Sequence, residues 1–514
     1  MEELNEELKK HLEAAREGGG EERIEKQHEK GKMTARERID YLVDEGSFRE
    51  MNPFTRHRCT DFGMEEKHPP GDGVVTGAAK IDGRQVYVMA QDFTVMGGSL
   101  GEMHAEKIVA AMDKAYENRV PFIQINDSGG ARIQEGIRSL NGYGKIFKRN
   151  TMASGVIPQI TCIMGPCAGG AVYSPAITDF IFMVDETSNM FLTGPKVIKE
   201  VTGEEVSVEE LGGAETHAQV TGTADKYFTD DRECLDEVKR LLRFLPDSFE
   251  EPPPFEKVED PVDRQTDKIK EVLPTEPKKA FDMRDIIKPA LDGKKFMEFK
   301  ETFAPNAVVG LGRLGGYPVG IIGNQPKTLA GCLDIDSSDK IARFIRLCDS
   351  FNLPLINFVD VPGFLPGVDQ EHGGVIRHGA KMLYAYSEAT VPKISLIVRK
   401  SYGGAFVAMC SRDMGYDSVL AYPTAEIAVM GARGAVNIIH SDEIEEADDP
   451  EAKRQEKIEE FREQFAKPYK AAEAGLVDTI INPAETRKSL VETLEMIISK
   501  REDRPDKKHG NIPL

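Results

Sequence analysis

Apolar and polar positions follow two periodicities along this chain, and their alternation predicts an α/β protein. Residues 74–77 and 85–90 form apolar runs that predict paired strands, and the runs 121–125 and 157–164 predict buried strands. Between them, residues 102–118 place apolar side chains at helical spacing. Strands that alternate with helices are typical of an α/β architecture.

The N-terminal region is rich in charge and predicts helices. The first thirty residues predict a solvated helix that glycines 18–20 interrupt. A second helix is expected over 34–45, because Thr34 and Glu37 form a capping-box pattern that can satisfy free amides at a helix start. The N-terminus lacks the apolar core of a signal peptide, and no stretch reaches the roughly 18 uncharged apolar residues of a membrane span. We therefore expect a cytoplasmic protein without a membrane span.

A change in composition separates the two halves of the chain. Prolines 252–254, Pro261 and many charges follow residue 246 and are typical of a linker. The α/β alternation resumes after residue 277. The sequence therefore predicts four parts: a charged N-terminal helix (1–30), a first domain (31–250), a linker (251–277) and a second domain (278–514).

The second half repeats the landmarks of the first half at a nearly constant offset. Gly77 and Asp127 are matched by Gly310 and Asp360, each 233 positions later (310 − 77 and 360 − 127). After one inserted residue, the Gly-Gly-Ala string 169–171 is matched at an offset of 234 by the string 403–405 (403 − 169). Solenoid repeats have periods of roughly 20–50 residues. The repeat therefore indicates two homologous α/β domains.

Composition and charge exclude several function classes. Hydrophobic residues at 40% and charged residues at 30% are values of a globular protein. A net charge of −21 argues against a nucleic-acid backbone or an anionic membrane as main partner. Seven scattered cysteines show neither zinc spacing nor the even count of a disulfide framework. His372 and His378 fit no standard zinc pattern, so no metal is expected.

The strongest chemical signal is the Gly-Gly-Ala string that follows an apolar strand in each half, within residues 165–172 and 401–406. Glycines at a strand-to-helix turn leave backbone N–H groups free to approach a ligand. Such amides, helped by the helix dipole, can hold an oxyanion, and one donor contributes about 3 kcal/mol in a transition state. The alternative is a tight turn packed against a neighbouring strand. Two copies at matched positions favour two oxyanion sites, which indicates two carbonyl groups activated together.

A second matched pair of loops begins at Asp127 and Asp360, each directly after a short apolar strand. Enzymes of the α/β class place ligand loops at such strand ends. The residues after them, including Gly129 and Gly130, are expected to form a pocket wall or ligand-facing amides. A strand-end turn capped by the aspartate is an equally good interpretation.

Catalysis by side chains has little support. Ser99 lies in a G-x-S-x-G string, but no histidine and acid can be assigned to it, and a glycine-rich turn is favoured. The string 310–315 fits the dinucleotide pattern G-x-G-x-x-G, but a strand follows it where a helix is required, which predicts a hairpin. Tyr143, flanked by glycine, is expected to be a packing residue. The chemistry is therefore expected to depend on the backbone.

At these motifs the sequence resembles the carboxyltransferase subunits of biotin-dependent acyl-CoA carboxylases, closest to propionyl-CoA carboxylase β chains and methylmalonyl-CoA decarboxylase α subunits. The strings that carry the likeness in the first half are GKMTARERIDYLVDEGSF (31–48), DFTVMGGSLGEMHAEKI (92–108), DSGGARIQEG (127–136) and GPCAGGAVYSPA (165–176). Those in the second half are GCLDIDSSDKIARF (331–344), FVDVPGFLPG (358–367), IRHGAKMLYAYSEATVPK (376–393), RKSYGGAF (399–406), PTAEIAVMGARGAV (423–436) and KKHGNIPL (507–514).

The resemblance implies two crotonase-like domains, the first on the acyl-CoA side and the second on the biotin side. It implies that Gly169 and Gly170 hold the thioester oxygen as the enolate forms, and that Gly404 and Ala405 hold the ureido oxygen of biotin. The freed biotin nitrogen is expected to take the α-proton, so no protein base is needed. The residues expected to line the substrates are Ala168, Ala171, Gly129, Gly130, Gly403, Phe406 and Val407.

The implied reaction moves a carboxyl group between carboxybiotin and the α-carbon of a short acyl-CoA, as in propionyl-CoA to methylmalonyl-CoA. The chain lacks an Ala-Met-Lys-Met string, so biotin is expected on a carrier in a separate chain, with a biotin carboxylase subunit as partner. The family also implies a homo-oligomer, a ring-shaped hexamer with its active site at a dimer interface.

Three alternatives remain open from the sequence. The first is the α subunit of a sodium-pumping methylmalonyl-CoA decarboxylase, which runs the transfer in reverse. The second is a non-catalytic acyl-CoA-binding or scaffold subunit. The third is a crotonase-type hydratase, which would need a glutamate near the first glycine loop, and none lies between Gly165 and Phe180. Val407 stands where many relatives have aspartate, which leaves the acyl-chain preference open.

Overall fold

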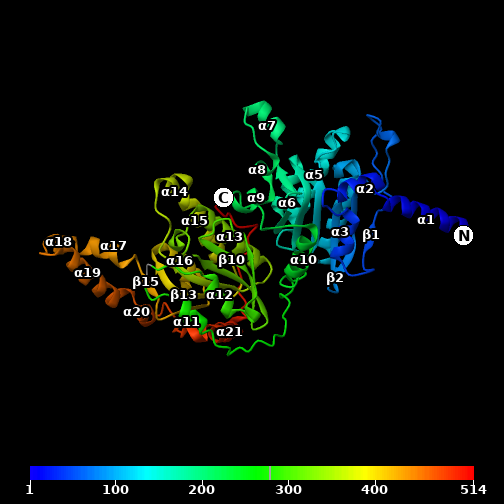
Figure 1. Ribbon diagram of the computed structural model, residues 1–514. Helices are drawn as coiled ribbons and strands as arrows, with labels where there is room; N and C mark the ends of the chain where they lie inside the picture. The colour runs from blue at the N-terminus through cyan, green and yellow to red at the C-terminus, as the bar shows by residue number, and fades with distance from the viewer. Residues whose placement is uncertain (277–278, 514) are drawn as a thin grey trace. The chain divides into compact units, whose positions relative to one another are not determined.

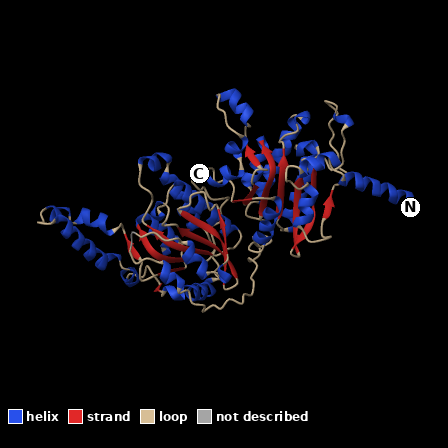
Figure 2. Ribbon diagram, viewed as in Figure 1, coloured by secondary structure: helices blue, strands red, loops and turns tan. Residues whose placement is uncertain are grey.

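A computed structural model of the chain describes residues 1–276 and 279–513. It divides into two compact units, Met1–Glu251 and Pro252–Leu514. Each unit is built on its own eight-stranded sheet with helices packed against it (Figures 1 and 2). The α/β class predicted from the sequence is therefore confirmed.

The sheet of the first unit has the strand order β1-β2-β3-β4-β5-β6-β8, with β7 beside β5. An antiparallel hairpin, β2–β3, continues into the parallel strands β4, β5 and β6. The strands are β1 Arg49–Met51, β2 Val74–Ile81, β3 Arg84–Gln91, β4 Phe122–Ser128, β5 Gln159–Ala168, β6 Phe180–Val184, β7 Asn189–Phe191 and β8 Lys226–Phe228. The α-helices are α1 Glu2–Arg16, α2 Glu21–His28, α3 Ala35–Leu42, α4 Glu102–Asn118, α5 Ile137–Ala153, α6 Tyr173–Ile177, α7 Pro195–Thr202, α8 Val208–Gly212, α9 Ala214–Gln219 and α10 Asp231–Leu242.

The sheet of the second unit has the order β16-β14-β13-β12-β11-β10-β9, with β15 beside β13. Its strands are β9 Phe296–Phe299, β10 Ala307–Leu314, β11 Tyr317–Asn324, β12 Leu355–Val361, β13 Lys393–Tyr402, β14 Ser418–Ala421, β15 Glu426–Ala428 and β16 Thr479–Ile480. The α-helices are α11 Lys268–Val272, α12 Arg284–Ala290, α13 Ile335–Ser350, α14 Val368–Gly373, α15 Val375–Glu388, α16 Gly403–Cys410, α17 Ala432–Ile439, α18 Ser441–Glu445, α19 Pro450–Phe461, α20 Pro468–Glu473 and α21 Thr486–Ile497.

The internal repeat is confirmed strand by strand. β2, β3 and β4 begin 233 positions before β10, β11 and β12, and β5 begins 234 positions before β13. The central strands β4 and β12 are buried at every position, as expected of parallel strands covered on both faces. The string 310–315 lies at the end of the antiparallel pair β10–β11, so it forms the predicted hairpin.

The predicted helices of the N-terminal region are present. α1 and α2 are separated by the glycines 18–20, and the capping box of Thr34 and Glu37 opens α3. α3 ends at Leu42, three residues before the expected end at 45, because Val43 leaves the helix in an extended conformation. Over the described part of the chain, no helix combines the length and the apolar character needed to cross a membrane.

The stretch that the sequence presents as a linker contributes to the second unit. Ile269 of α11 is fully buried, and the carbonyl oxygen of Pro254 accepts a hydrogen bond from Arg313 Nη1 at 2.7 Å. Prolines and charges indicated solvent-facing backbone, but individual apolar side chains anchor this stretch to the core. The expected boundary between 277 and 278 lies outside the described residues.

Two buried lysines fasten equivalent helices to equivalent strands. Lys107 on α4 donates to the carbonyl oxygens of Gly71 and Val74, at 2.9 and 2.6 Å. Lys340 on α13, 233 positions later, donates to four carbonyl oxygens at 2.7–3.3 Å, including that of Ala307 at the start of β10. Burial lowers the pKa of Lys107 to about 8 and the pKa of Lys340 to about 7.

We expect Lys340→Met to lower the free energy of unfolding by about 3 kcal/mol, because buried carbonyl groups lose their donor. The pKa of Lys340 is about 7 in the folded chain and 10.5 as the unperturbed value. The folded chain therefore binds fewer protons between these values, and the contribution of Lys340 to stability rises with pH across this window. Urea unfolding at several pH values should show this slope in the wild-type protein and its loss in the variant.

Lys114→Met is the control for this experiment, because Lys114 lies on the exposed face of α4 and pairs only with the exposed Glu117. Its effect on the free energy of unfolding should stay within about 0.5 kcal/mol. Equal pH slopes in wild type and Lys340→Met would contradict the assignment.

Candidate active site

Each unit has a strand-to-helix turn that carries the Gly-Gly-Ala string. In the first unit β5 ends at Ala168, and a 3₁₀ turn over Gly169–Val172 leads into α6. In the second unit β13 ends at Tyr402, and α16 starts at Gly403. Gly169 and Gly403 have φ values of 64° and 57°, in the left-handed region that favours glycine. The geometry of both turns therefore depends on the first glycine.

The backbone amides of these turns lie where a ligand oxygen could be held. Gly169 and Gly170 are the first two residues of their helical segment, and Gly403, Gly404 and Ala405 are the first three of α16. N–H groups in a first turn have no partner within the helix, and they lie at its positive end. An oxyanion is stabilised by such donors when they are already aligned. The two turns can therefore serve as a pair of oxyanion sites.

Aromatic side chains lie behind both turns. A Cβ atom added to Gly170 would lie 3.4 Å from Tyr143 Cδ2, and one added to Gly404 would lie 3.9 Å from Phe364 Cε2. Tyr143 is only 5% exposed, so it packs in the core as the sequence predicted. The rings occupy the space behind each turn.

The expected role of the 127–130 loop changes in the structure. The N–H of Gly129 donates to the carbonyl oxygen of Gly97 at 2.9 Å, and the N–H of Gly130 donates to Ser128 Oγ at 3.1 Å. Both N–H groups therefore already have an acceptor within the protein, so they do not face a ligand as the first interpretation expected. Asp127 is fully buried, and its carboxylate is bound by side chains in an ion cluster.

The other side chains singled out in the sequence have ordinary partners. Ser99 Oγ donates to the carbonyl oxygen of Met96 at 2.8 Å, which agrees with a glycine-rich turn. His378 Nδ1 lies 2.8 Å from Asp339 Oδ2, in a contact between α15 and α13. Within residues 1–276 and 279–513, no group of three or more His, Cys, Asp or Glu side chains is arranged to hold a metal ion.

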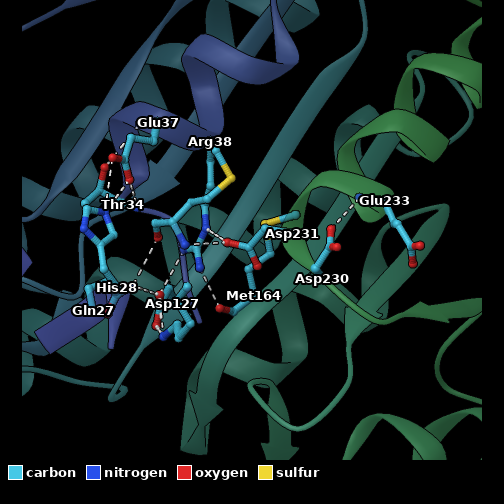
Figure 3. A network of polar contacts seen from close by, with 12 residues as sticks. Gln27, His28, Thr34, Glu37, Arg38, Asp127, Met164, Asp230, Asp231 and Glu233 are labelled. Carbon is cyan, nitrogen blue, oxygen red and sulfur yellow. Dashed lines mark hydrogen bonds and ion pairs between the residues drawn. The ribbon is translucent and has the colours of Figure 1, made fainter. Parts of the chain in front are cut away.

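A buried cluster of charges joins α3 to β4, β5 and α10 (Figure 3). Arg38 of α3 donates to Asp127 Oδ2 at 2.9 Å, to Asp231 Oδ2 at 2.7 Å and to the carbonyl oxygen of Met164 at 2.8 Å. Lys32 Nζ donates to Asp127 Oδ1 at 2.8 Å, and Gln27 Nε2 donates to Asp127 Oδ2 at 2.9 Å. One arginine therefore joins the end of β4, the middle of β5 and the start of α10.

The charge states in this cluster follow from burial and pairing. Burial alone would lower the pKa of Arg38, but the carboxylates of Asp127 and Asp231 outweigh it and raise that pKa. Burial lowers the pKa of Lys32, and Asp127 opposes the lowering. Sequence reasoning missed Lys32, Arg38 and Asp231. Cationic side chains beside apolar positions of the 34–45 helix are the sequence feature that could have indicated a buried ion pair.

We expect Gly165→Ala to be strongly destabilising, because its Cβ would overlap Asp127 Oδ1 and lie 2.6 Å from Lys32 Nζ. Overpacking of this kind typically costs about 1–3 kcal/mol. Gly144→Ala is the matched control: Gly144 is exposed inside α5, and nothing lies within 4 Å of an added Cβ. It should raise the free energy of unfolding by about 0.5–1 kcal/mol, since alanine is the better helix former. Urea unfolding measures both, and a neutral Gly165→Ala would be evidence against the packing described.

The carboxyl transferase domain family matches residues 26–512 of this chain. This chain belongs to the carboxyl transferase family. It is 59% identical, over the full length of both chains, to the protein named propionyl-CoA carboxylase, carboxyltransferase subunit, of Haloferax mediterranei. It is 57% identical to the methylmalonyl-CoA decarboxylase subunit alpha of Propionigenium modestum, over 97% of this chain and 96% of the relative. The expected resemblance and the expected enzyme class, an acyl-CoA carboxyltransferase, are confirmed.

The crystal structure of transcarboxylase 12S, described as a hexamer with methylmalonyl-coenzyme A and methylmalonic acid bound, is similar throughout. The TM-score is 0.97 at 53% identity, with 100% of this chain and 98% of that chain covered. This similarity confirms the expected fold of two crotonase-like domains. The relatives include both carboxylase and decarboxylase subunits at nearly equal identity.

Proposed function

We propose that this carboxyltransferase moves a carboxyl group between carboxybiotin, carried on a separate chain, and the α-carbon of propionyl-CoA, with methylmalonyl-CoA as the product. The observation that carries the proposal is the pair of equivalent Gly-Gly-Ala turns, one in each duplicated unit. The names of the relatives and the methylmalonyl-CoA in the similar crystal structure support a short acyl-CoA.

Each of the two turns can bind one carbonyl oxygen, and the two oxygens differ in charge. In this proposal Gly169 and Gly170 hold the thioester oxygen, which becomes negative as the α-carbon turns into an enolate. Gly404 and Ala405 hold the ureido oxygen of biotin. Each donor contributes about 3 kcal/mol at the transition state. Biotin supplies the carried carboxyl group and the nitrogen that accepts the α-proton, which accounts for a reaction without a protein base.

The residues beside the turns are proposed to line the substrates. On the acyl-CoA side these are Ala168, Ala171, Gly129 and Gly130, the last two through their backbone surface because their amides are engaged. On the biotin side they are Gly403, Phe406 and Val407. Val407 lies on α16 one turn after Gly403 and is 44% exposed, so its side chain is available to a ligand.

The partners are proposed to be a biotin carrier, a biotin carboxylase subunit and further copies of this chain. The similar crystal structure is described as a hexamer. Equivalent helices of the two units expose large apolar side chains: Val201 on α7 is 76% exposed, and Ile438 on α17 is 68% exposed. Apolar surface of this kind typically becomes buried in an assembly. Seven free cysteines, six of them buried, support a reducing compartment such as the cytoplasm.

The reverse transfer of a decarboxylase α subunit is the second candidate, and the 57% identity to such a subunit favours keeping it. Both directions use the same two turns, and the partner subunits set the direction. The scaffold alternative predicts binding of acyl-CoA without transfer.

We expect the purified chain to transfer the carboxyl group of labelled methylmalonyl-CoA to free biocytin without ATP. Gly169→Val should abolish this transfer, because valine at φ 64° distorts the turn. Gly404→Val should also abolish it, because a Cβ at this position would lie 3.9 Å from the Phe364 ring, so the larger side chain displaces the turn from that ring. Native oligomeric state, checked by light scattering, is the control for assembly. Wild-type turnover in either variant would remove the oxyanion assignment, and absence of transfer in the wild type with intact acyl-CoA binding would support the scaffold alternative.

Val407→Asp should change the choice of acyl-CoA, because it places a carboxylate on the exposed face of α16. We expect the ratio of kcat/KM for methylmalonyl-CoA over malonyl-CoA to change by roughly 10-fold, as is typical when one pocket methyl group or charge is altered. Met496→Asp on α21, whose side chain is 75% exposed, is the control for added surface charge. An unchanged ratio would place residue 407 away from the acyl chain.

A further inference from the structure

Asp127 and Asp360 occupy equivalent positions at the ends of β4 and β12, 233 residues apart, and neither is exposed. In both units the strand register shifts beside the aspartate. The pairing of β4 with β5 moves from Asn126↔Ile163 to Ser128↔Cys167, and that of β12 with β13 moves from Val359↔Ile397 to Val361↔Ser401. The extra residues of β5 and β13 therefore pass next to the carboxylate just before each Gly-Gly turn.

The backbone of the two aspartates is held in the same way. The N–H of Asp127 donates to Gln91 Oε1 at 3.3 Å, and the N–H of Asp360 donates to Asn324 Oδ1 at 3.2 Å. Gln91 and Asn324 are themselves 233 positions apart and end β3 and β11. The backbone N–H of each aspartate therefore has an equivalent partner in the two units.

The cation that pairs with the aspartate comes from a different part of the chain in each unit. In the second unit the bulged strand itself provides it: Arg399 Nη2 lies 2.8 Å from Asp360 Oδ2, and the N–H of Lys400 donates to Asp360 Oδ1 at 2.9 Å. At the offset of 234, the first unit has Gly165 and Pro166 instead. Glycine has no side chain to replace that of Arg399, and proline has no N–H to replace that of Lys400, so neither contact of the second unit can form here.

The N-terminal segment takes over this role in the first unit. Lys32 Nζ lies 2.6 Å from the place where a Cβ of residue 165 would stand, so the lysine fills the space that a longer side chain there would need. Arg38 adds a second cation and binds the carbonyl oxygen of Met164, directly before Gly165. The same buried charge is therefore neutralised from the strand in one unit and from residues 27–38 in the other.

We propose that Asp127 and Asp360 are positioning residues of the two Gly-Gly turns, and that residues 27–38 help to position the first turn through Asp127. The inference rests on the proposed function of these turns. Gly165 is four residues before Gly169, and Arg399 is four residues before Gly403, so each ion pair sets the path of the strand into its turn. A displacement of reacting groups by about 1 Å costs on the order of 100-fold in rate, so small shifts of this path affect turnover.

Asp127→Asn and Asp360→Asn test the inference in the full-length oligomer, since asparagine keeps the shape of the side chain and removes its charge. Transfer from methylmalonyl-CoA to biocytin should show kcat reduced by about 10- to 100-fold, with KM for both substrates changed by no more than about 3-fold, because alignment and not binding is lost. Thermal unfolding is recorded for each variant.

Asp292→Asn is the matched control. Asp292 is 5% exposed, lies 2.6 Å from the fully buried Arg487, and accepts the N–H groups of Gly315 and Gly316. Gly315 and Gly316 form the hairpin turn directly before β11, whereas the second Gly-Gly turn follows the end of β13. Both β11 and β13 run parallel to β12, which lies between them. The control therefore removes an equally buried charge at the opposite end of the sheet. Its thermal midpoint should fall, with kcat unchanged within about 2-fold.

Lys32 provides a second test that does not remove the aspartate. Lys32→Met should reduce kcat by about 10-fold, and Lys32→Arg should retain turnover because it keeps a cation beside Asp127. Each variant is compared with Asp292→Asn at a similar fall in thermal midpoint. The inference is overturned if Lys32→Met, Asp127→Asn and Asp360→Asn then have the same kcat as Asp292→Asn. Absence of transfer in the wild-type oligomer would instead overturn the proposed function, and this inference with it.

Discussion

A buried charge constrains both units at the same place in the fold. In each unit an aspartate at the end of the strand next to the one that leads into the Gly-Gly-Ala turn is held by cations at 2.7–2.9 Å. Burying such charges is costly unless each one is paired and hydrogen-bonded. The cluster around Asp127 meets this condition with Lys32, Arg38 and Gln27, and the cluster around Asp360 meets it with Arg399 and the N–H of Lys400.

The duplication shows which features the fold requires and which can change. The strands β2–β5, the buried lysines on α4 and α13 and the positive φ of the first turn glycine are kept at offsets of 233 or 234. The source of the cation beside the aspartate differs, as does the helix that follows each turn: a 3₁₀ turn with the five-residue α6 in one unit, and the eight-residue α16 in the other. Two copies of one scaffold can therefore keep the same backbone donors while their surroundings adapt to different ligands.

Membership in the carboxyl transferase family makes this chain an acyl-CoA carboxyltransferase. In the proposed mechanism the residues of both turns act through backbone N–H groups, so a variant that keeps the backbone can differ in side chains such as Val407 without losing the chemistry. The relatives at 59% and 57% identity fit this view, because their names describe opposite directions of one transfer.

The features that depend on neighbouring residues could be predicted from the sequence alone. These are the repeat, the hairpin β10–β11, the capping box of α3 and the glycines at both strand-to-helix turns, since each follows from local spacing and backbone freedom. The contacts of Asp127, which local sequence presented as a loop residue, became visible only in the folded chain. Its partner Lys32 lies 95 positions away, and Arg38 reaches Asp231 across 193 positions. Ion pairs over such separations depend on how the strands and α3 pack together, and no local sequence pattern indicates them.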